Sequence, residues 1–309
     1  SFVVFYIIYK IKYTFFHNEG YFLMQITKEN LTIIIVTIKS EKIIDNCISS
    51  IDSDIKKIVI ENSDNKEFID SLKKKYENIE CYITGKNLGM GAGNNFGIKK
   101  TKSRYVMILN PDTVLKKDTL EEIYKVSNNL DFAVLSPLSD NKDYPNYKIK
   151  EKTYKNKKNI FEVDAVDGYA MVLDKTKYNE IFFDEKIFMY LENDDLCLRM
   201  KKKGEKIYIC SNSKINHLGA KAVNQKFGYE LELSRNWHWS WSQFYYKKKH
   251  YGFIKAFLFC IPLLIKSSCK CIYYFIIANK FKLKIYSRRT SGLFNSLFNK
   301  SSWYRPRFD

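Results

Sequence analysis

Residues 86–115, KNLGMGAGNNFGIKKTKSRYVMILNPDTVL, contain the pattern that decides the fold of this chain. A glycine-rich loop opens the stretch, an amphipathic helix follows, and Tyr105–Leu109 then forms a short apolar strand. Asn110-Pro111-Asp112 ends this strand abruptly. Open α/β sheets bind ligands beyond the carboxyl ends of their strands, which is where Asp112 falls. The stretch therefore predicts a βαβ unit with a ligand site at the strand end.

Glycine and asparagine dominate the loop that opens this stretch. A chain without Cβ atoms turns tightly and approaches a ligand closely, and four such positions follow one another: Gly89, Gly91, Gly93 and Gly97. Asn94 and Asn95 are expected at the start of the helix, where they would cap it and present their amides. An ordinary βαβ turn with a solvated aspartate explains a lone glycine-rich loop equally well. The loop and Asp112 form one unit, which favours a nucleotide and metal site.

The flanking segments alternate between strands and helices, which predicts a parallel α/β sheet. Glu61 ends the second of these strands as Asp112 ends the central one, so it is expected either to bond a base or ribose edge or to stand beside a helix N-cap. A lysine-rich segment without periodicity is expected to form a loop at 139–159. Strands are expected at 31–38, 57–61, Ile79–Ile83, 132–136, 163–173 and 206–210, and helices at 41–50, 66–76 and 117–129.

A second acidic cluster, YLENDDL at 190–196, enters a helix expected at 196–203. Acids in a first helical turn favour the helix through its dipole, and this is a purely structural account. Glu192, Asp194 and Asp195 also repel one another, which raises the pKa of one of them and suits it to act as a general base. His217 is either a structural histidine or a metal ligand beside Asp112, and neutral imidazole suits Mn²⁺ better than Mg²⁺.

The 309-residue chain has a net charge of +18, and its basic residues are concentrated near the C-terminus. From position 234 onward there are fifteen Lys and Arg but only one acid, Asp309. No RNA- or DNA-binding signature accompanies them, so an anionic membrane surface is the expected partner and nucleic acid is not. The seven cysteines have no metal-ligand spacing and are expected as reduced core or lipid-facing residues.

Aromatic and basic residues alternate through this C-terminal part. A helix at 233–250 would place tryptophans, tyrosines and lysines together, as at a membrane interface. The apolar runs 253–265 and 271–278 contain lysines and Pro262, so two interfacial helices are expected, with a lysine-snorkelled span or a soluble helical pair as alternatives. Residues 302–306 would tie the tail to the catalytic part or to the membrane surface.

These motifs, in this order, resemble family 2 glycosyltransferases of the GT-A fold. The closest likeness is to the rhamnosyltransferase-like enzymes that build bacterial surface polysaccharides. The resemblance covers about 31–224, and its most specific parts are NLGMGAGNN at 87–95 and NPDT at 110–113. YLENDDLCLR at 190–199 and HLG at 217–219 complete it. It implies a Rossmann-like, mostly parallel α/β sheet flanked by helices, with a C-terminal helical, membrane-associating extension.

The resemblance also implies roles for particular residues. Asp112 would hold a divalent metal, Mg²⁺ or Mn²⁺, with help from His217. The base would come from the acidic cluster, but the second acid of the family's Glu-Asp pair is Asn193 here, so Asp194 or Glu192 would take over beside Asp195. The first strand also ends differently, at Thr37-Ile38-Lys39. The implied sugar-nucleotide site comprises Thr37, Glu61, Asn62, Asn87, Gly89, Gly93, Asn94, Asn95, Asn110, Asp112 and Gly168.

The implied function is that of an inverting glycosyltransferase that moves a sugar, rhamnose being one candidate, from a nucleotide-diphosphate donor to a lipid-linked glycan acceptor. Asn193 motivates the alternative of a non-catalytic, membrane-bound sugar-nucleotide-binding or scaffold protein. A nucleotidyltransferase would want a basic glycine-rich loop near the N-terminus, and none is present. We expect a catalytic domain at 24–232, an interfacial tail at 233–309 and a cytoplasmic, peripheral location on the inner face of the cell membrane. Residues 1–23 are expected to be an extension, with Met24 as the native start.

Overall fold

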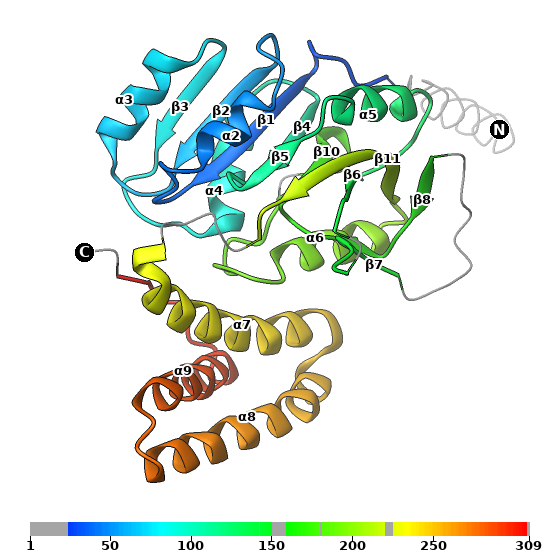
Figure 1. Ribbon diagram of the computed structural model, residues 1–309. Helices are drawn as coiled ribbons and strands as arrows, with labels where there is room; N and C mark the ends of the chain where they lie inside the picture. The colour runs from blue at the N-terminus through cyan, green and yellow to red at the C-terminus, as the bar shows by residue number, and fades with distance from the viewer. Residues whose placement is uncertain (1–23, 142, 150–158, 180, 220–224, 308–309) are drawn as a thin grey trace, which may run out of the picture.

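The computed structural model describes residues 24–141, 143–149, 159–179, 181–219 and 225–307. The expected N-terminal extension, 1–23, lies outside these ranges, and so does much of the expected loop at 139–159. In the described part, a sheet with helices on both faces lies above a group of three long C-terminal helices (Figure 1).

Strands and helices largely alternate in the first half of the sheet domain, as the sequence predicts, whereas in the described residues from 134 to 174 strand follows strand without an α-helix. Its strands are β1 (Leu31–Thr37), β2 (Lys56–Glu61), β3 (Ile79–Ile83), β4 (Tyr105–Leu109), β5 (Thr113–Leu115), β6 (Val134–Ser139), β7 (Tyr147–Lys148), β8 (Ile160–Glu162), β9 (Ala165–Val166), β10 (Ala170–Asp174) and β11 (Ile207–His217). Its helices are α2 (Ile44–Ser49), α3 (Lys66–Lys75), α4 (Met90–Ile98), α5 (Thr119–Ser127) and α6 (Glu192–Lys202).

The main sheet has nine strands in the order β3-β2-β1-β4-β10-β6-β11-β5, with β8 beside β11. Strands β1 to β4 pair in parallel, whereas β10 lies antiparallel between β4 and β6. Successive side chains of β1 enter opposite layers: Ile33 and Ile35 pack with α2, α3 and α5, and Ile34 and Val36 pack with α4 and α6. Burial on both faces explains the unbroken apolar run of this strand.

Two strand predictions differ from the structure. The expected strand at 163–173 is divided into β9 and β10, and the turn between them carries Gly168. The strand expected at 206–210 continues as β11 to His217, and its last residues pair with β5. These last residues, KINH at 214–217, alternate polar and apolar side chains because this edge of the sheet is only half buried.

The glycine-rich loop enters α4 differently from the prediction. Helix α4 begins at Met90 after Gly89, whose φ of 86° is a left-handed conformation that favours glycine. Asn94 and Asn95 therefore lie inside the helix, and the expectation that they cap it is wrong. A Cβ at Gly97 would come within 2.6 Å of the Ile34 side chain, so this glycine lets α4 pack directly on the sheet.

The C-terminal part contains α7 (Gly228–Tyr251), α8 (Phe253–Ile276) and α9 (Lys280–Leu297). In Figure 1, α7 lies next to the sheet domain and α8 lies farthest from it. The expected boundary at 232/233 falls inside α7. The prediction of two separate interfacial helices is wrong, because α8 runs unbroken through Pro262. By length and composition alone, α8 is long and apolar enough to cross a membrane, and 17% of its most apolar 18-residue stretch is buried. A core helix of a soluble protein passes the same test of length and composition.

Candidate functional site

The carboxyl ends of β1, β2 and β4 bring the first predicted site residues together. Thr37 and Glu61 are register partners at the ends of β1 and β2, and Asn110 follows β4, the parallel neighbour of β1 on its other side. The parallel pairing of these strands explains why residues that each follow a different apolar run share one edge of the sheet.

Unpaired polar atoms concentrate at this edge. A buried donor or acceptor without a hydrogen bond costs about 1–3 kcal/mol, so native proteins contain few of them. In the described part of the chain nine side-chain atoms are of this kind, and six belong to residues that the sequence predicted as site residues. These six atoms are Thr37 Oγ1, Glu61 Oε2, Asn94 Oδ1, Asn110 Oδ1, Asp112 Oδ1 and Glu192 Oε2. Their clustering indicates groups that are kept available for a ligand.

Asp112 and His217 meet although they are far apart in the sequence. The antiparallel pair of β5 and β11 places His217 opposite Thr113 and brings its Nε2 to 3.4 Å from Asp112 Oδ1. The ring of Tyr169 stacks on His217 at 3.9 Å and fixes its orientation. Burial raises the pKa of the Tyr169 hydroxyl to about 12, so this wall of the site is neutral.

This pair fits a divalent metal. Oxygen and nitrogen ligands in neighbouring positions of one small cation lie roughly 3 Å apart, which is close to the Asp112–His217 separation. Apart from this contact with His217, Asp112 Oδ1 has no hydrogen-bond partner among the described residues. Within the described ranges no group of three or more His, Cys, Asp or Glu side chains could hold a metal. The two residues would therefore share the ion with phosphate oxygens of a ligand, as Mg²⁺ and Mn²⁺ commonly require.

The Glu61 carboxyl is a weaker acid than an ordinary glutamate, because its pKa is raised. Its side chain is fully buried, which raises its pKa to about 7, while a hydrogen bond from the Ser63 hydroxyl acts in the opposite direction. A protonated carboxyl both donates and accepts hydrogen bonds. At neutral pH the free Oε2 side of Glu61 is therefore suited to either kind of group on a nucleobase or ribose.

Other predicted residues brace the glycine-rich loop. The Asn62 side chain donates to Gly89 O at 3.1 Å and accepts from Leu88 N at 3.0 Å. Asn87 Oδ1 accepts from Gly89 N at 3.0 Å. Asn95 bonds the backbone of Phe183 at 2.8 and 3.0 Å, which fixes the loop after β10 against α4. Direct ligand contacts by these asparagines remain a prediction.

The acidic cluster occupies the first turn of α6, and its three carboxylates have different surroundings. Asp194 pairs with Lys148 at 2.5 Å. Glu192 Oε2 has no partner, and burial, with a smaller contribution from the charge of Asp194, raises the pKa of Glu192 to about 7. This agrees with the prediction that one acid has a raised pKa. Asn193 donates to Val166 O at 2.7 Å, a bond that an ionised aspartate could not make.

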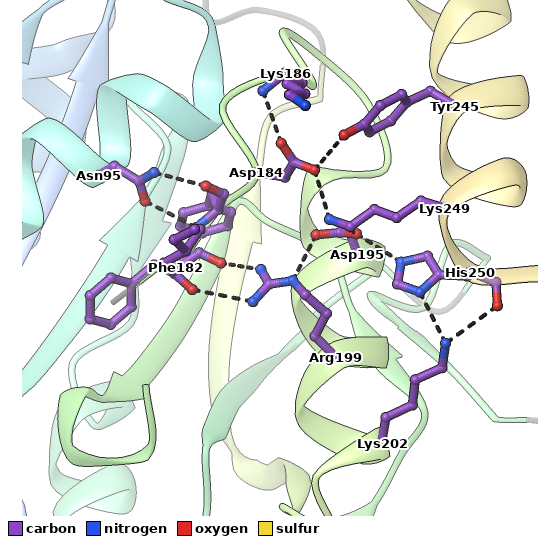
Figure 2. Close-up of polar contacts among 12 residues, drawn as sticks. Asn95, Phe182, Asp184, Lys186, Asp195, Arg199, Lys202, Tyr245, Lys249 and His250 are labelled. Atoms are coloured by element: carbon purple, nitrogen blue, oxygen red, sulfur yellow. Dashed lines mark hydrogen bonds and ion pairs between the residues drawn. The ribbon is translucent and has the colours of Figure 1, made fainter. Parts of the chain in front are cut away.

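Asp195, the third acid, is fully buried and is contacted by two cationic side chains and a histidine (Figure 2). Arg199 Nε lies at 2.9 Å, and Lys249 Nζ and His250 Nε2 lie at 2.7 Å each. Lys249 and His250 come from the last turn of α7, so Asp195 joins the tail to the helix that carries Glu192. Its surroundings make Asp195 a structural link rather than an available base.

A cavity of about 150 Å³ adjoins the predicted donor residues. It is lined by Asn62, Asn87, Gly89 and Asn110 and is bordered by α7 and the C-terminal segment. Two of these bordering residues, Leu231 and Arg235, lie on α7 and had no signal in the sequence, whereas Pro306 belongs to the segment 302–306 that was expected to reach the catalytic part or the membrane surface. Arg235 pairs with no carboxylate in the described ranges, so its guanidinium is available to an anion. The tail thus forms part of the site.

Asp167 is a further residue that the sequence reasoning missed. Burial raises the pKa of its carboxyl, while the nearby charges of Lys148 and His217 oppose the shift and that of Asp194 adds to it. Asp167 is therefore close enough to His217 and to Asp194 for their charges to act on it. The Asp-Gly dipeptide in the middle of an apolar run was the signal that could have indicated it.

Comparisons with known proteins agree with this geometry. The family model described as "Glycosyl transferase family 2" matches residues 32–197. The low-salt glycan biosynthesis hexosyltransferase Agl10 of Haloferax volcanii is 25% identical over 201 residues, which are 59% of this chain and 65% of that protein. Rhamnosyltransferase WbbL of Escherichia coli strain K12 is 25% identical over 208 residues, 57% of this chain and 78% of that protein. The aligned part thus spans 65%, less than two thirds, of the first relative's length.

Solved structures share the fold. The mannosyltransferase PcManGT from Pyrobaculum calidifontis, in complex with GDP-Man and Mn²⁺, superimposes with a TM-score of 0.51 at 10% identity and covers 96% of this chain and 95% of that chain. GalNAc-T7 with UDP, GalNAc and Mn²⁺ gives a TM-score of 0.50 at 12% identity, over 68% and 51% of the two chains. At such low identity these likenesses support the GT-A architecture.

Proposed function

The chain belongs to glycosyl transferase family 2, and from this premise we propose that it transfers a sugar from a nucleotide-diphosphate donor to a hydroxyl group of a glycan acceptor. The observation that carries the proposal is the set of unpaired, buried polar atoms at the carboxyl edge of the sheet, which coincides with the predicted donor residues. Rhamnose is one candidate sugar, because a matched relative is a rhamnosyltransferase.

In this proposal the donor nucleotide lies along the ends of β1 and β2. Glu61 and Thr37 bond the base and ribose edge through their unpaired oxygens. Asn110 and Arg235 meet the phosphate region, where a guanidinium makes short, charge-assisted hydrogen bonds. The braced loop around Gly89 holds the other side of the nucleotide. Gly168 lies against Asn193 and borders the sugar and the acceptor.

Asp112 and His217 would hold a divalent metal on the donor diphosphate. When bound, the metal supplies Lewis-acid neutralisation of the negative charge on the leaving diphosphate. Two features of the chain would favour metal binding here. Asp112 Oδ1 has no hydrogen bond among the described residues, and the stacked ring of Tyr169 holds the imidazole of His217 in position.

Glu192 is the proposed general base. Among the described residues of the acidic cluster it alone has a buried carboxylate oxygen without a hydrogen-bond partner, and its pKa of about 7 suits proton transfer near neutral pH. The carboxylate takes the proton of the acceptor hydroxyl while the oxygen forms a bond to the anomeric carbon. The bond from that carbon to the diphosphate breaks, and the diphosphate leaves with the electron pair. A single displacement of this kind inverts the anomeric configuration.

We also propose that the protein works at the inner face of a cell membrane on a lipid-linked acceptor. In this arrangement the sheet domain carries the catalytic residues, and the helices from α7 onward associate with the membrane. The exposed side of α8 carries large apolar residues, including Ile254, Leu258, Ile272, Phe275 and Ile276. Apolar helices with lysines at their edges bind such interfaces. A spanning α8 is the alternative arrangement.

A thermal-shift titration with sugar nucleotides, with and without Mn²⁺, tests the proposed function, because a ligand that binds only the folded state raises Tm. We expect a shift that needs both metal and one nucleotide, disappears in Asp112→Ala and persists in Asp118→Ala, which changes an exposed acid. Formation by the wild type of a glycoside whose anomeric configuration is inverted relative to the donor would complete the assignment. Donor binding without hydrolysis or transfer would instead support the second candidate, a non-catalytic sugar-nucleotide-binding protein, which Asn193 motivates.

A further inference from the structure

A second, larger cavity lies on the other side of Phe188 from the donor site. It measures about 840 Å³ and is enclosed by the C-terminal half of α7, the end of α9 and the loop around residue 186. Phe188 lines both this cavity and the donor cavity. The C-terminal segment also borders both, with Arg305 in the larger cavity and Pro306 in the donor cavity. A ligand held here would therefore be next to the donor.

Positive charge without a counter-charge marks this cavity. Five cationic side chains line it, whereas its only acid is Glu185, which accepts a hydrogen bond from Asn95. Lys249 is neutralised by Asp184 and Asp195. The remaining four are Lys186, Lys248, Lys300 and Arg305, and none of them pairs with a carboxylate in the part of the chain that the structure describes. Figure 2 shows Lys186, on the loop, and Lys249, on α7, on either side of Asp184.

The wall of the cavity is prepared for a ligand with both a polar and an apolar part. Ser296 lines it, and the buried hydroxyl of Ser296 has no hydrogen-bond partner among the described residues. The Arg305 guanidinium lies 3.8 Å from the centre of the Phe188 ring, so one face of this cation is held by an aromatic ring rather than by an acid. Trp241 and Trp303 add apolar surface.

A separate apolar cleft lies near this cavity, on the side of α8. The residues next to Tyr245 and Ser296 in the chain, Phe244 and Leu297, line a narrow apolar cleft where α8 meets α7 and α9. Cations and an unpaired hydroxyl on one side, and hydrocarbon on the other, match a phosphate group attached to a long apolar chain.

We propose that this cavity binds the phosphate or diphosphate of the lipid carrier to which the acceptor glycan is attached. The inference rests on the proposed function, since it places the acceptor's lipid phosphate beside the donor site. Lys186, Lys300 and Arg305 bond the phosphate oxygens, the aromatic wall covers the first part of the hydrocarbon, and α8 meets the rest of the chain at the membrane.

Binding of the full-length protein to vesicles tests this assignment. The probes are phosphatidylcholine vesicles alone, the same vesicles with a polyprenyl phosphate, and vesicles with phosphatidylglycerol at equal surface charge, with inorganic pyrophosphate as competitor. Tryptophan fluorescence is the readout, because the chain has four Trp and two of them line the cavity. We expect tighter binding to polyprenyl phosphate than to phosphatidylglycerol, and displacement by pyrophosphate.

The variant Lys300→Gln/Arg305→Gln should weaken polyprenyl-phosphate binding at least about tenfold, since each charged hydrogen bond contributes about 1.5–3 kcal/mol. The variant Lys280→Gln/Lys282→Gln removes the same charge from exposed positions of α9 outside the cavity and should bind like the wild type. Lys186→Gln tests the opposite wall independently and is expected to weaken binding too, so misfolding of the C-terminal segment cannot account for both results.

Two outcomes would overturn the inference. One is equal binding to polyprenyl phosphate and phosphatidylglycerol. The other is equal loss in the cavity variants and in the control variant, which would mean that total charge alone determines binding. Metal-dependent donor binding is measured on the same samples, so the two proposals fail separately. Intact donor binding with no lipid-phosphate preference refutes only the cavity assignment, whereas absent donor binding refutes the proposed function.

Discussion

The Nε2 atom of His250 lies 2.7 Å from Oδ1 of Asp195, and this contact joins the last turn of α7 to the first turn of α6. Asp195 is fully buried and also binds Arg199 and Lys249. This contact fixes the C-terminal helices against α6, the helix that carries the proposed base, Glu192. The tail is thus built into the catalytic part rather than appended to it.

Asp195→Asn should destabilise the protein by about 3 kcal/mol, because removing one partner of a buried ion pair leaves its cations uncompensated. Urea unfolding followed by tryptophan fluorescence measures this change. Glu77→Gln, which neutralises an exposed acid, is the matched control and should leave the midpoint within error. A midpoint for Asp195→Asn equal to that of the control would show that the link contributes nothing to stability.

Asp112→Asn and His217→Gln should each lower Mn²⁺ affinity in the presence of donor nucleotide by more than tenfold, since each removes or weakens one of the two protein ligands. Isothermal titration of metal into the protein with nucleotide provides the measurement. Asp118→Asn changes an exposed acid on the same segment and should bind metal normally. Unchanged affinity in Asp112→Asn would place the metal elsewhere.

Glu192→Gln should reduce kcat by about 10²–10⁴-fold, the usual contribution of a general base. Asp194→Asn should have a much smaller effect, because the carboxylate of Asp194 already pairs with Lys148. In the wild type the rate should rise as pH increases through about 7, where Glu192 loses its proton. Steady-state kinetics across pH 5.5–8.5 separates the two acids. A larger loss in Asp194→Asn would make Asp194 the base.

The stability of the tail should depend on pH because of the buried side chain of His238. Its Nε2 lies 2.8 Å from Tyr304 O, which can only accept, so Nε2 carries the proton and Nδ1 accepts from Ser302. Burial lowers the pKa of His238 to about 3 from an ordinary value of 6.5. Between these values the unfolded state binds more protons than the folded state, so stability falls as pH decreases below about 6.5.

This histidine should contribute up to about 1.4 kcal/mol of lost stability per pH unit in that window. Denaturant unfolding at pH 7.5, 6 and 5 measures the slope, and the tryptophans of α7 report on the tail. His238→Gln retains a donor towards Tyr304 but does not titrate, so its slope should be shallower. A packing defect in His238→Gln lowers the unfolding free energy by the same amount at every pH, so it does not change the slope of stability against pH. Identical slopes for the wild type and the variant would contradict the assignment.

The exposed side of α8 should determine vesicle binding. Leu258→Asp/Ile272→Asp changes two side chains that are 64% and 63% exposed. Because each loses about 1.5–3 kcal/mol of apolar burial in the membrane, co-sedimentation with vesicles should fall more than tenfold. Tyr144→Asp alters a 76% exposed residue on the sheet domain and should bind as the wild type does. Equal binding by all three proteins would argue against membrane association through α8.

Much of the fold could be predicted because its signals are local. β3 and β4 occur at the expected positions, since short apolar runs bounded by polar residues have few alternatives. The Gly-rich loop, Asp112 and the acidic cluster were recognisable for the same reason. The helix start at Met90 was missed because the asparagines resembled caps, whereas the left-handed conformation of Gly89 supplies the actual start. The unbroken α8 was missed because Pro262 and the lysines resembled interruptions.

The sequence by itself determined most of the order of strands and helices, the family and the chemical types of the site residues, because these depend on local patterns of polarity and on motifs. Only the tertiary structure decided which residues meet. The pairing of β5 with β11 brings His217 to Asp112, and the packing of α7 beside α6 brings Lys249 and His250 to Asp195. The tertiary structure also decided that, among the described residues, Glu192 Oε2 has no hydrogen-bond partner, whereas Lys148 pairs with Asp194. Contacts of this kind depend on long-range packing and burial, which no local stretch of sequence encodes.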